Sequence, residues 1–212
     1  MMSPDRLHLE AWDSDYRTRG MLWGGNPAPL PELPGGSRVI EFGCGNGKNL
    51  PGMIEKGWDI TAMDCSITAL QLCRPVVHDA GGVHFVVGDA ISLPIRDVVV
   101  DAVFSLHVAG HLAGPGRTLF AREILRVLRP GGQIVFRDFG VDDFRCGNGE
   151  MTEPGTFHRG TGSSTHYFTG DEVARLFSAF TCKFIDEHRW IMRIKGQDYQ
   201  RCEITAIFEK PA

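Results

Sequence analysis

The residues of this chain that could do chemistry begin with a glycine-rich turn after a short apolar run. In "VIEFGCGNGKN", residues 39–49, Glu41 precedes three glycines spaced two apart, Gly43, Gly45 and Gly47. Glycines at a strand-to-helix turn let the backbone approach a bound molecule closely. A carboxylate at such a turn repels a pyrophosphate but can hold an ammonium group. The segment therefore predicts a site for a ligand with a positively charged amino-acid end.

Two common phosphate-binding motifs do not fit this turn. A P-loop reads G-x-x-x-x-G-K-[ST], but counting back from Gly47 and Lys48 gives Phe42, and Asn49 replaces the Ser or Thr. The dinucleotide fingerprint reads G-x-G-x-x-G, whereas the spacing here is G-x-G-x-G. The turn therefore favours a ligand held by its amino-acid end.

Two further carboxylates end apolar runs of the same kind. Asp64 closes "DITAMD" and Asp89 closes "FVVGD", and both runs read as strands. An acid at the tip of the second strand can accept hydrogen bonds from ribose hydroxyls, and the next can accept from an adenine amino group. Because open α/β sheets bind ligands at the carboxyl ends of their strands, the three acids predict adjoining amino-acid, ribose and base sites.

The run Asp138-Phe139-Gly140 spells the "DFG" of protein kinases. A kinase also needs an upstream H-R-D loop, a glycine-rich loop over the phosphates and a V-A-I-K lysine, and the sequence has none of them. Here "FRDFG" instead ends an apolar run that reads as a fifth strand. Arg137 and Asp138 are therefore expected at the same edge of the sheet as the other acids.

The elements that must position these residues alternate between strand and helix patterns. We expect strands at 37–43, 58–64, 83–89, within 98–106 and at 132–138, and helices at 49–57, 66–74, 116–132 and 169–180. Ser66 and Thr169 are the predicted helix caps. Such alternation indicates a parallel sheet with helices on both faces, and residues 182–210 predict a closing antiparallel hairpin.

Two segments interrupt this alternation. Residues 24–36 hold four prolines and four glycines, so we expect a linker there, with residues 1–36 forming an arm and linker and 37–212 the main domain. Residues 140–169 are polar and glycine-rich, which predicts a long functional loop on the substrate side.

The bulk properties describe an ordinary globular chain of 212 residues with a net charge of −4. An acidic balance argues against tight, unaided binding to a phosphate backbone. No apolar run approaches the ~20 residues of a membrane span, and the charged N-terminal segment lacks an apolar signal core, so a cytoplasmic location is expected. The six cysteines form no C-x-x-C pair, which favours free thiols over a zinc site.

Five motifs, taken in order, resemble the class I S-adenosylmethionine-dependent methyltransferases. They are "EFGCGNG" at 41–47, Asp64, "GDA" at 88–90, "DAVFSLHVAGHL" at 101–112 and "LRPGGQIVF" at 128–136. The resemblance implies a three-layer, Rossmann-like α/β fold whose seven-stranded sheet is parallel except for the last strand, which inserts beside the fifth. It also implies S-adenosyl-L-methionine as cofactor, S-adenosyl-L-homocysteine as product and methyl transfer to an acceptor heteroatom.

The resemblance also assigns residues to the cofactor. They are Trp12, Tyr16, Glu41, Gly43, Cys44, Gly45, Asn49, Asp64, Cys65, Asp89, Ala90 and Ser105. The aromatic residues of the N-terminal arm are either a lid over the cofactor or a structural packing element. No metal is expected, since two histidines after the fourth strand lack an evident third ligand.

Acceptor handling is expected from the residues after the fourth and fifth strands. The predicted catalytic residues are His107, His111, Arg137 and Asp138, and the predicted substrate-binding residues are Arg159, His166 and Tyr167. Each has a structural alternative: satisfied histidines, an ion pair that anchors a loop, or solvated loop side chains.

A finer resemblance links both ends of the chain to the tRNA 3-methylcytidine methyltransferases. "AWDSDY" is similar to their Trp-Asp-x-x-Tyr, and "FRDFG" followed by "FHRGTGSSTHYFT" is similar to their tail. Phe139 replaces a tyrosine, "GTGSSTH" replaces Asp-Gly-Thr-Arg, and the chain lacks their long basic extension. We therefore expect a small-molecule acceptor, with a tRNA base as the alternative, a protein side chain third and a non-catalytic cofactor-binding module last.

Overall fold

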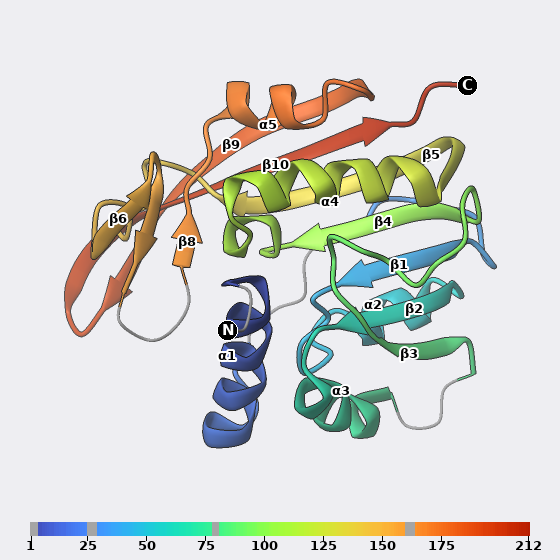
Figure 1. Cartoon of the computed structure of the whole chain (residues 1–212), viewed down its shortest axis with the longest axis horizontal. Coiled ribbons are helices and arrows are strands. Elements are labelled where there is room, and N and C mark those ends of the chain that lie inside the picture. Colours follow the sequence, from blue (N-terminus) through green and yellow to red (C-terminus); the bar gives the residue numbers. More distant parts are fainter. Residues whose placement is uncertain (1–3, 25–28, 78–80, 160–163) are drawn as a thin grey trace.

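A seven-stranded sheet forms the centre of the structure, a computed structural model that describes residues 4–24, 29–77, 81–159 and 164–212 (Figure 1). Its strand order is β3-β2-β1-β4-β5-β10-β9. The strands are β1 (Arg38–Phe42), β2 (Asp59–Asp64), β3 (Val83–Val87), β4 (Val100–Leu106), β5 (Leu128–Phe139), β9 (Thr181–Ile194) and β10 (Gln197–Glu209). The first five pair in parallel, whereas β10 is antiparallel to both β5 and β9. The expected antiparallel last strand beside the fifth is confirmed.

Helices cover both faces of this sheet. They are α2 (Leu50–Glu55), α3 (Ile67–Cys73), α4 (Gly114–Val127) and α5 (Gly170–Leu176), with a short 3-10 turn η1 (Arg74–Val77). Helix α1 (Pro4–Arg19) and the 3-10 turn η2 (Ala109–His111) lie at the carboxyl edge of the sheet instead (Figure 1). Successive strand residues point to opposite faces, so Ile40 packs in the core with α4 and α5, while Val39 packs in the core with α2 and α3. The three-layer arrangement predicted from the sequence is confirmed.

Local sequence signals account for the helix boundaries. The Ser66 and Thr169 hydroxyls accept hydrogen bonds from backbone amides three residues later, as predicted for helix caps. The predicted helix 116–132 is too long, because α4 ends at Val127 and Leu128 already pairs with Val100 of β4. Pairing with a neighbouring strand therefore ends this helix before the proline and glycines do.

The segment 140–169, expected to be a loop, contains β6 (Glu150–Glu153), β7 (Thr156–His158) and β8 (Ser164–His166). They form a separate antiparallel sheet of three strands. Such short, polar strands give almost no apolar periodicity, which is why the sequence did not reveal them. Figure 1 shows α1 and this small sheet on the side toward which the arrows of β1 and β4 point.

Within the described residues, no helix is both long and apolar enough to cross a bilayer.

The carboxyl edge of the sheet is surrounded by the strand ends, η2, α1 and the segment after β5. This edge is where α/β folds bind ligands.

Candidate active site

A cavity of about 570 Å³ lies at the carboxyl edge of the sheet, within the range of about 300–1,000 Å³ typical of small-molecule sites. On the β1–β3 side its lining includes Trp12, Tyr16, Gly43, Cys44, Asn49, Asp64, Cys65, Asp89 and Ala90. On the β4–β10 side it includes His107, His111, Arg137, Phe139, Arg145, Trp190, Met192, Arg201 and Glu203. One cavity therefore joins most of the predicted cofactor residues to three of the predicted acceptor residues, His107, His111 and Arg137.

Glu41 is a buried carboxylate behind the wall of this cavity, with 1% of its surface exposed. Its Oε1 accepts a hydrogen bond of 2.7 Å from Nδ2 of Asn49, which lines the cavity. Its Oε2 has no hydrogen-bond partner in the part of the chain that the structure describes. Burial, together with the charge of Asp64, raises the pKa of Glu41 to about 7, against the bond from Asn49, which lowers it. A cationic group at this wall would stabilise the carboxylate.

Asp64, at the end of β2, is held by two backbone amides. Its Oδ2 accepts from the amide of Gly45 and its Oδ1 from the amide of Ser66, both at 2.9 Å. Burial raises the pKa of Asp64, and these bonds oppose that shift. Each carboxylate oxygen has a second lone pair, so a ligand hydroxyl can still be accepted.

The other predicted cofactor residues divide into two groups. Asp89 lines the cavity beside Ala90, and its Oδ1 accepts from the amide of Ile91 at 3.1 Å. Gly45 and Ser105 lie behind the lining, and Ser105 is fully buried with a hydroxyl that has no partner among the described residues. The backbone of Gly45 thus acts on Asp64, not on the cavity surface.

The N-terminal arm closes over the glycine turn. Nε1 of Trp23 donates to the Tyr16 hydroxyl at 2.9 Å, and Asn46 exchanges two hydrogen bonds with the Trp23 backbone. Gly45 has a φ of 56°, and a Cβ there would lie 2.6 Å from the Tyr16 oxygen. Only glycine therefore allows this approach of arm and turn.

Asp13 fastens the same arm to α3. Its Oδ1 accepts from the Ser66 hydroxyl at 2.7 Å and from the Thr68 amide at 3.0 Å. The pKa of Asp13 is lowered because these bonds and the charge of Arg17 outweigh the effect of burial, the largest single contribution, which raises it. The arm is thus anchored at both the glycine turn and the start of α3.

His107 directly follows β4 with a φ of 61°, a left-handed conformation that is strained for a residue other than glycine. Its Nε2 lies 3.4 Å from Oε1 of Glu203, and its ring stacks on Phe139 with centroids 4.4 Å apart. Its Nδ1 is buried without a hydrogen bond to any described residue, 3.9 Å from Oδ1 of Asp138. This ring is held between two carboxylates at the cavity wall.

Asp138 is not in the cavity lining and has 2% of its surface exposed. Its Oδ2 accepts from the Gly110 amide at 2.8 Å and its Oδ1 from the Phe139 amide at 3.0 Å. These bonds hold η2 against the end of β5 through backbone amides, rather than through the loop-anchoring ion pair named as the structural alternative from the sequence. Arg137 does line the cavity, and its Nε donates to the Thr205 hydroxyl at 3.2 Å.

His111 lines the cavity from η2. Its Nδ1 donates to the carbonyl oxygen of Ser164 at 2.9 Å, and its ring meets Trp12 edge-on with centroids 4.8 Å apart. Burial lowers the pKa of this imidazole, more than the charge of Asp138 raises it. His111 thus connects the arm, η2 and the small sheet.

The three predicted substrate-binding residues lie outside the cavity lining. Arg159 donates to the Arg145 carbonyl at 3.0 Å and to the Tyr167 hydroxyl. His166 is buried between the Thr156 hydroxyl and Glu172. Residues 160–163, the first four of the run "GTGSSTH", lie outside the described residues. In the described part of the chain, no three His, Cys, Asp or Glu side chains form a group that could hold a metal.

Sequence reasoning missed Arg145, Trp190, Met192, Arg201 and Glu203, which line the acceptor side. A signal exists on β10, where buried Cys202, Ile204, Ala206 and Phe208 alternate with partly exposed polar residues. Because β10 is inserted beside β5, its partly exposed polar residues lie next to the end of β5, where Glu203 is paired with Phe139. The inserted position of β10, combined with this alternation, could have revealed Arg201 and Glu203.

Comparison with known proteins agrees with this fold. Residues 40–136, from β1 through most of β5, match the family described as Methyltransferase domain. The matched segment, somewhat less than half of the chain, is thus similar to methyltransferase domains. The matched residues of this chain include the glycine turn, Asp64, Asp89 and His107.

Two curated relatives show the range of proteins to which this chain is similar. The tRNA N(3)-cytidine methyltransferase METTL2 of Gallus gallus is 27% identical over 200 residues, covering 85% of this chain and 54% of that protein. The 2-methyl-6-phytyl-1,4-hydroquinone methyltransferase of Synechocystis is 32% identical over 124 residues, 58% and 37% of the two chains. The chain thus spans about half, or less, of the length of these curated relatives.

A solved structure shares the fold across the whole chain. It is the Burkholderia thailandensis 1,6-didemethyltoxoflavin-N1-methyltransferase with bound 1,6-didemethyltoxoflavin and S-adenosylhomocysteine. The TM-score is 0.64 with 19% identity, and the match covers 99% of this chain and 80% of that chain.

Proposed function

We propose that this protein transfers a methyl group from S-adenosylmethionine to a heteroatom of a small molecule. The observation that carries the proposal is that one cavity joins Asn49, Asp64 and Asp89 on one side to His107 and Glu203 on the other. A cavity of about 570 Å³ closed by an aromatic arm suits a cofactor together with a small acceptor.

The residues present fit this cofactor. Glu41, whose Oε2 has no partner among the described residues, and the neighbouring Asp64 place two carboxyl groups on the β1–β3 side, and the ammonium group of the methionine end would stabilise their charged forms. Asn49 would hold that end from the wall, Asp64 the ribose hydroxyls and Asp89 the adenine amino group. When bound, S-adenosylmethionine supplies a methyl group on a sulfonium centre, which carries the difficult chemistry.

The other side of the cavity would handle the acceptor. His107 would take a proton from the acceptor atom, and Glu203 would orient the imidazole through its 3.4 Å contact with Nε2. Asp138 would act as a positioning residue, because it fixes η2 and the end of β5 around His107. The arm, anchored by Asp13 and Tyr16, would exclude water.

A tRNA base is the second candidate acceptor. The observation that favours it is the match to the METTL2 protein of Gallus gallus, which extends over 85% of this chain. The net charge of −4 weighs against it, since RNA binding draws on basic surface.

We also propose a reducing compartment such as the cytoplasm. The support is that all six cysteines carry free thiols in the structure, and Cys44, Cys73 and Cys202 are buried. Disulfides are rare in such compartments.

The proposal is tested by incubating the full chain with tritiated-methyl S-adenosylmethionine and three acceptor pools: a metabolite filtrate, total tRNA and cell protein. We expect label in the metabolite fraction, and loss of that label in the His107→Asn variant. Label confined to tRNA would transfer the assignment to the second candidate, and label in no fraction would contradict methyl transfer.

A further inference from the structure

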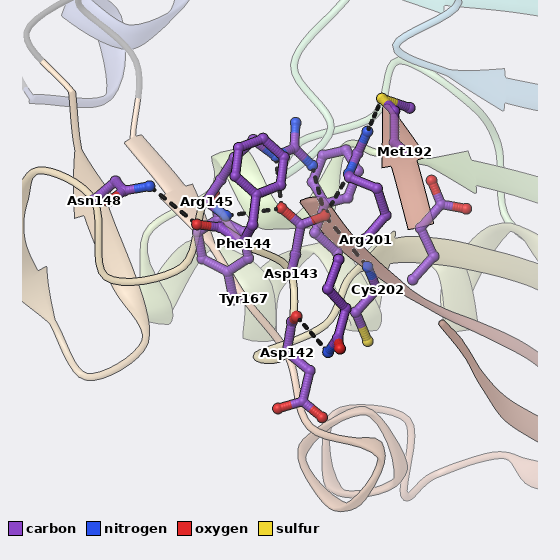
Figure 2. Close-up of polar contacts among 12 residues, drawn as sticks. Asp142, Asp143, Phe144, Arg145, Asn148, Tyr167, Met192, Arg201 and Cys202 are labelled. Carbon is purple, nitrogen blue, oxygen red and sulfur yellow. Dashed lines mark hydrogen bonds and ion pairs between the residues drawn. The ribbon is translucent and has the colours of Figure 1, made fainter. Parts of the chain in front are cut away.

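Asp143, in the segment after β5, binds two arginines that line the acceptor side of the cavity. Its side chain is fully buried, and both of its oxygens accept from guanidinium groups (Figure 2). Arg145 donates through Nε at 2.7 Å and Nη2 at 3.1 Å, and Arg201 donates through Nε at 2.7 Å. These bonds lower the pKa of Asp143 despite its burial, the largest single contribution, which raises it. The carboxylate is thus saturated with donors.

The two arginines keep N–H donors that Asp143 does not use. Among the described residues, Nη1 of Arg145 and Nη2 of Arg201 have no hydrogen-bond partner, and Nη1 of Arg201 meets only the Met192 sulfur at 3.6 Å. Both side chains line the cavity, although they come from a loop and from β10. With Arg137 included, three guanidinium groups face the carboxylates of Asp143 and Glu203, which leaves one positive charge on this side of the cavity.

Aromatic rings hold these arginines in place. The Arg145 guanidinium lies 3.9 Å from the Phe139 ring centroid, and that of Arg201 lies 5.3 Å from both Phe139 and Trp190. Since His107 also stacks on Phe139, that ring separates the imidazole from the arginines. Stacking and bidentate bonding fix the guanidinium planes, which lowers the entropy lost when they bind a ligand.

We propose that the methyl acceptor is a small molecule that carries a carboxylate or a phosphate monoester, and that Arg145 and Arg201 bind this oxyanion. The inference rests on the proposed function and adds the substrate class. Planar oxyanions match the fork of guanidinium donors, and both groups present unused N–H donors to one cavity. Arg137, from β5, lines the same side and adds a third guanidinium. The oxyanion would fix the acceptor so that its reacting atom faces His107.

The test uses benzoate, phenyl phosphate and the neutral benzamide as probes of the full chain saturated with S-adenosylhomocysteine. The Nε–H groups of Arg145 and Arg201 are bonded to buried Asp143, so their ¹⁵N–¹H signals should be visible by NMR. We expect saturable shifts of both signals with benzoate or with phenyl phosphate, and none with benzamide. Saturation by one anion alone identifies the oxyanion as carboxylate or phosphate. Shifts from neither anion, or equal shifts from benzamide, would overturn the inference.

Variants add a second readout. R201Q should weaken anion binding about tenfold, the loss expected for one charged hydrogen bond, whereas the exposed R193Q on β9 should bind as the wild type does. Equal weakening in both variants would count against a site at Arg201. If R201Q does not fold, the comparison of anions with benzamide in the wild type still decides.

The failure of this inference can be told from failure of the proposed function. Calorimetry with S-adenosylhomocysteine is done first, and cofactor binding without anion binding overturns only the oxyanion site. Absence of cofactor binding would instead contradict the proposed function. A short RNA that shifts the arginine signals, when neither small anion does, would overturn the small-molecule acceptor.

Discussion

Nε2 of His107 lies 3.4 Å from Oε1 of Glu203, which joins the end of β4 to the inserted strand β10 at the cavity wall. Burial, the largest single effect, raises the pKa of Glu203, but the bond with His107 and the charges of Arg137 and Arg201 together lower it. The carboxylate is therefore ionised at neutral pH and can orient an imidazole that accepts a proton.

The first prediction concerns this pair. Glu203→Gln removes the charge and retains the shape, so kcat for methyl transfer should fall at least about tenfold while KM for S-adenosylmethionine stays unchanged. The matched control is Glu209→Gln, on the same strand and paired with Lys183. Steady-state kinetics on the acceptor from the labelling screen measure the split. A rise in KM with unchanged kcat would assign Glu203 to ground-state binding.

The second prediction is a pH dependence caused by Glu41. Its pKa of about 7 in the fold exceeds the ordinary 4.5, so the folded chain holds a proton that the unfolded chain has released. Stability should therefore fall as the pH rises between these values, by about 3 kcal/mol from this group. Urea unfolding of the cofactor-free wild type and Glu41→Gln at pH 4.5 and pH 8 measures the difference. If the difference in the free energy of unfolding between the wild type and Glu41→Gln were the same at both pH values, this carboxylate would not titrate as described.

The sheet and its helices could be predicted because their signals are local. Apolar runs gave the five parallel strands, and hydroxyls at Ser66 and Thr169 marked two helix starts. The polar helix α1 has no strong apolar face and was read only as an arm, since its stability comes from contacts such as Asp13 with α3.

The cofactor side of the candidate site could be predicted from the sequence, whereas much of the acceptor side could not. Strand-end acids such as Asp64 and Asp89 follow from the rule that ligands bind at carboxyl edges. Arg145, Arg201 and Glu203 come together only through a buried carboxylate and the insertion of β10, which are long-range relationships. Asp138 has an acidic side chain at the expected edge, yet it points at two backbone amides, and sequence alone does not give that direction.

The third prediction concerns the arm. Asp13→Ala removes the acceptor for the Ser66 hydroxyl and the Thr68 amide. The free energy needed to open α1 locally should therefore fall by on the order of 1 kcal/mol. Amide hydrogen exchange of residues 10–19 should accelerate several-fold, and S-adenosylhomocysteine should restore part of the protection. Asp15→Ala, which removes only the exposed pair with Arg19 on the same helix, is the control. Equal exchange in both variants would show that Asp13 does not anchor the arm.

The fourth prediction concerns Asp138. Asp138→Asn places an amide group against one of the two backbone N–H donors, so stability should fall by about 1–3 kcal/mol. Affinity for S-adenosylhomocysteine should stay within about twofold, because Asp138 lies outside the cavity lining. Asp142→Asn, an exposed neighbour paired with Arg189, is the control for urea unfolding. Full stability with slowed methyl transfer would instead assign Asp138 a direct role in chemistry.

The central claim is that the cofactor binds between Glu41, Asp64 and the arm. Calorimetric titration of S-adenosylhomocysteine into the wild type, Asp64→Asn and Asp59→Asn tests this directly, because Asp59 begins the same strand that Asp64 ends. The account predicts one site per chain, binding weakened at least about tenfold in Asp64→Asn and wild-type affinity in Asp59→Asn. Equal affinity in all three proteins, or no binding to the wild type, would contradict it.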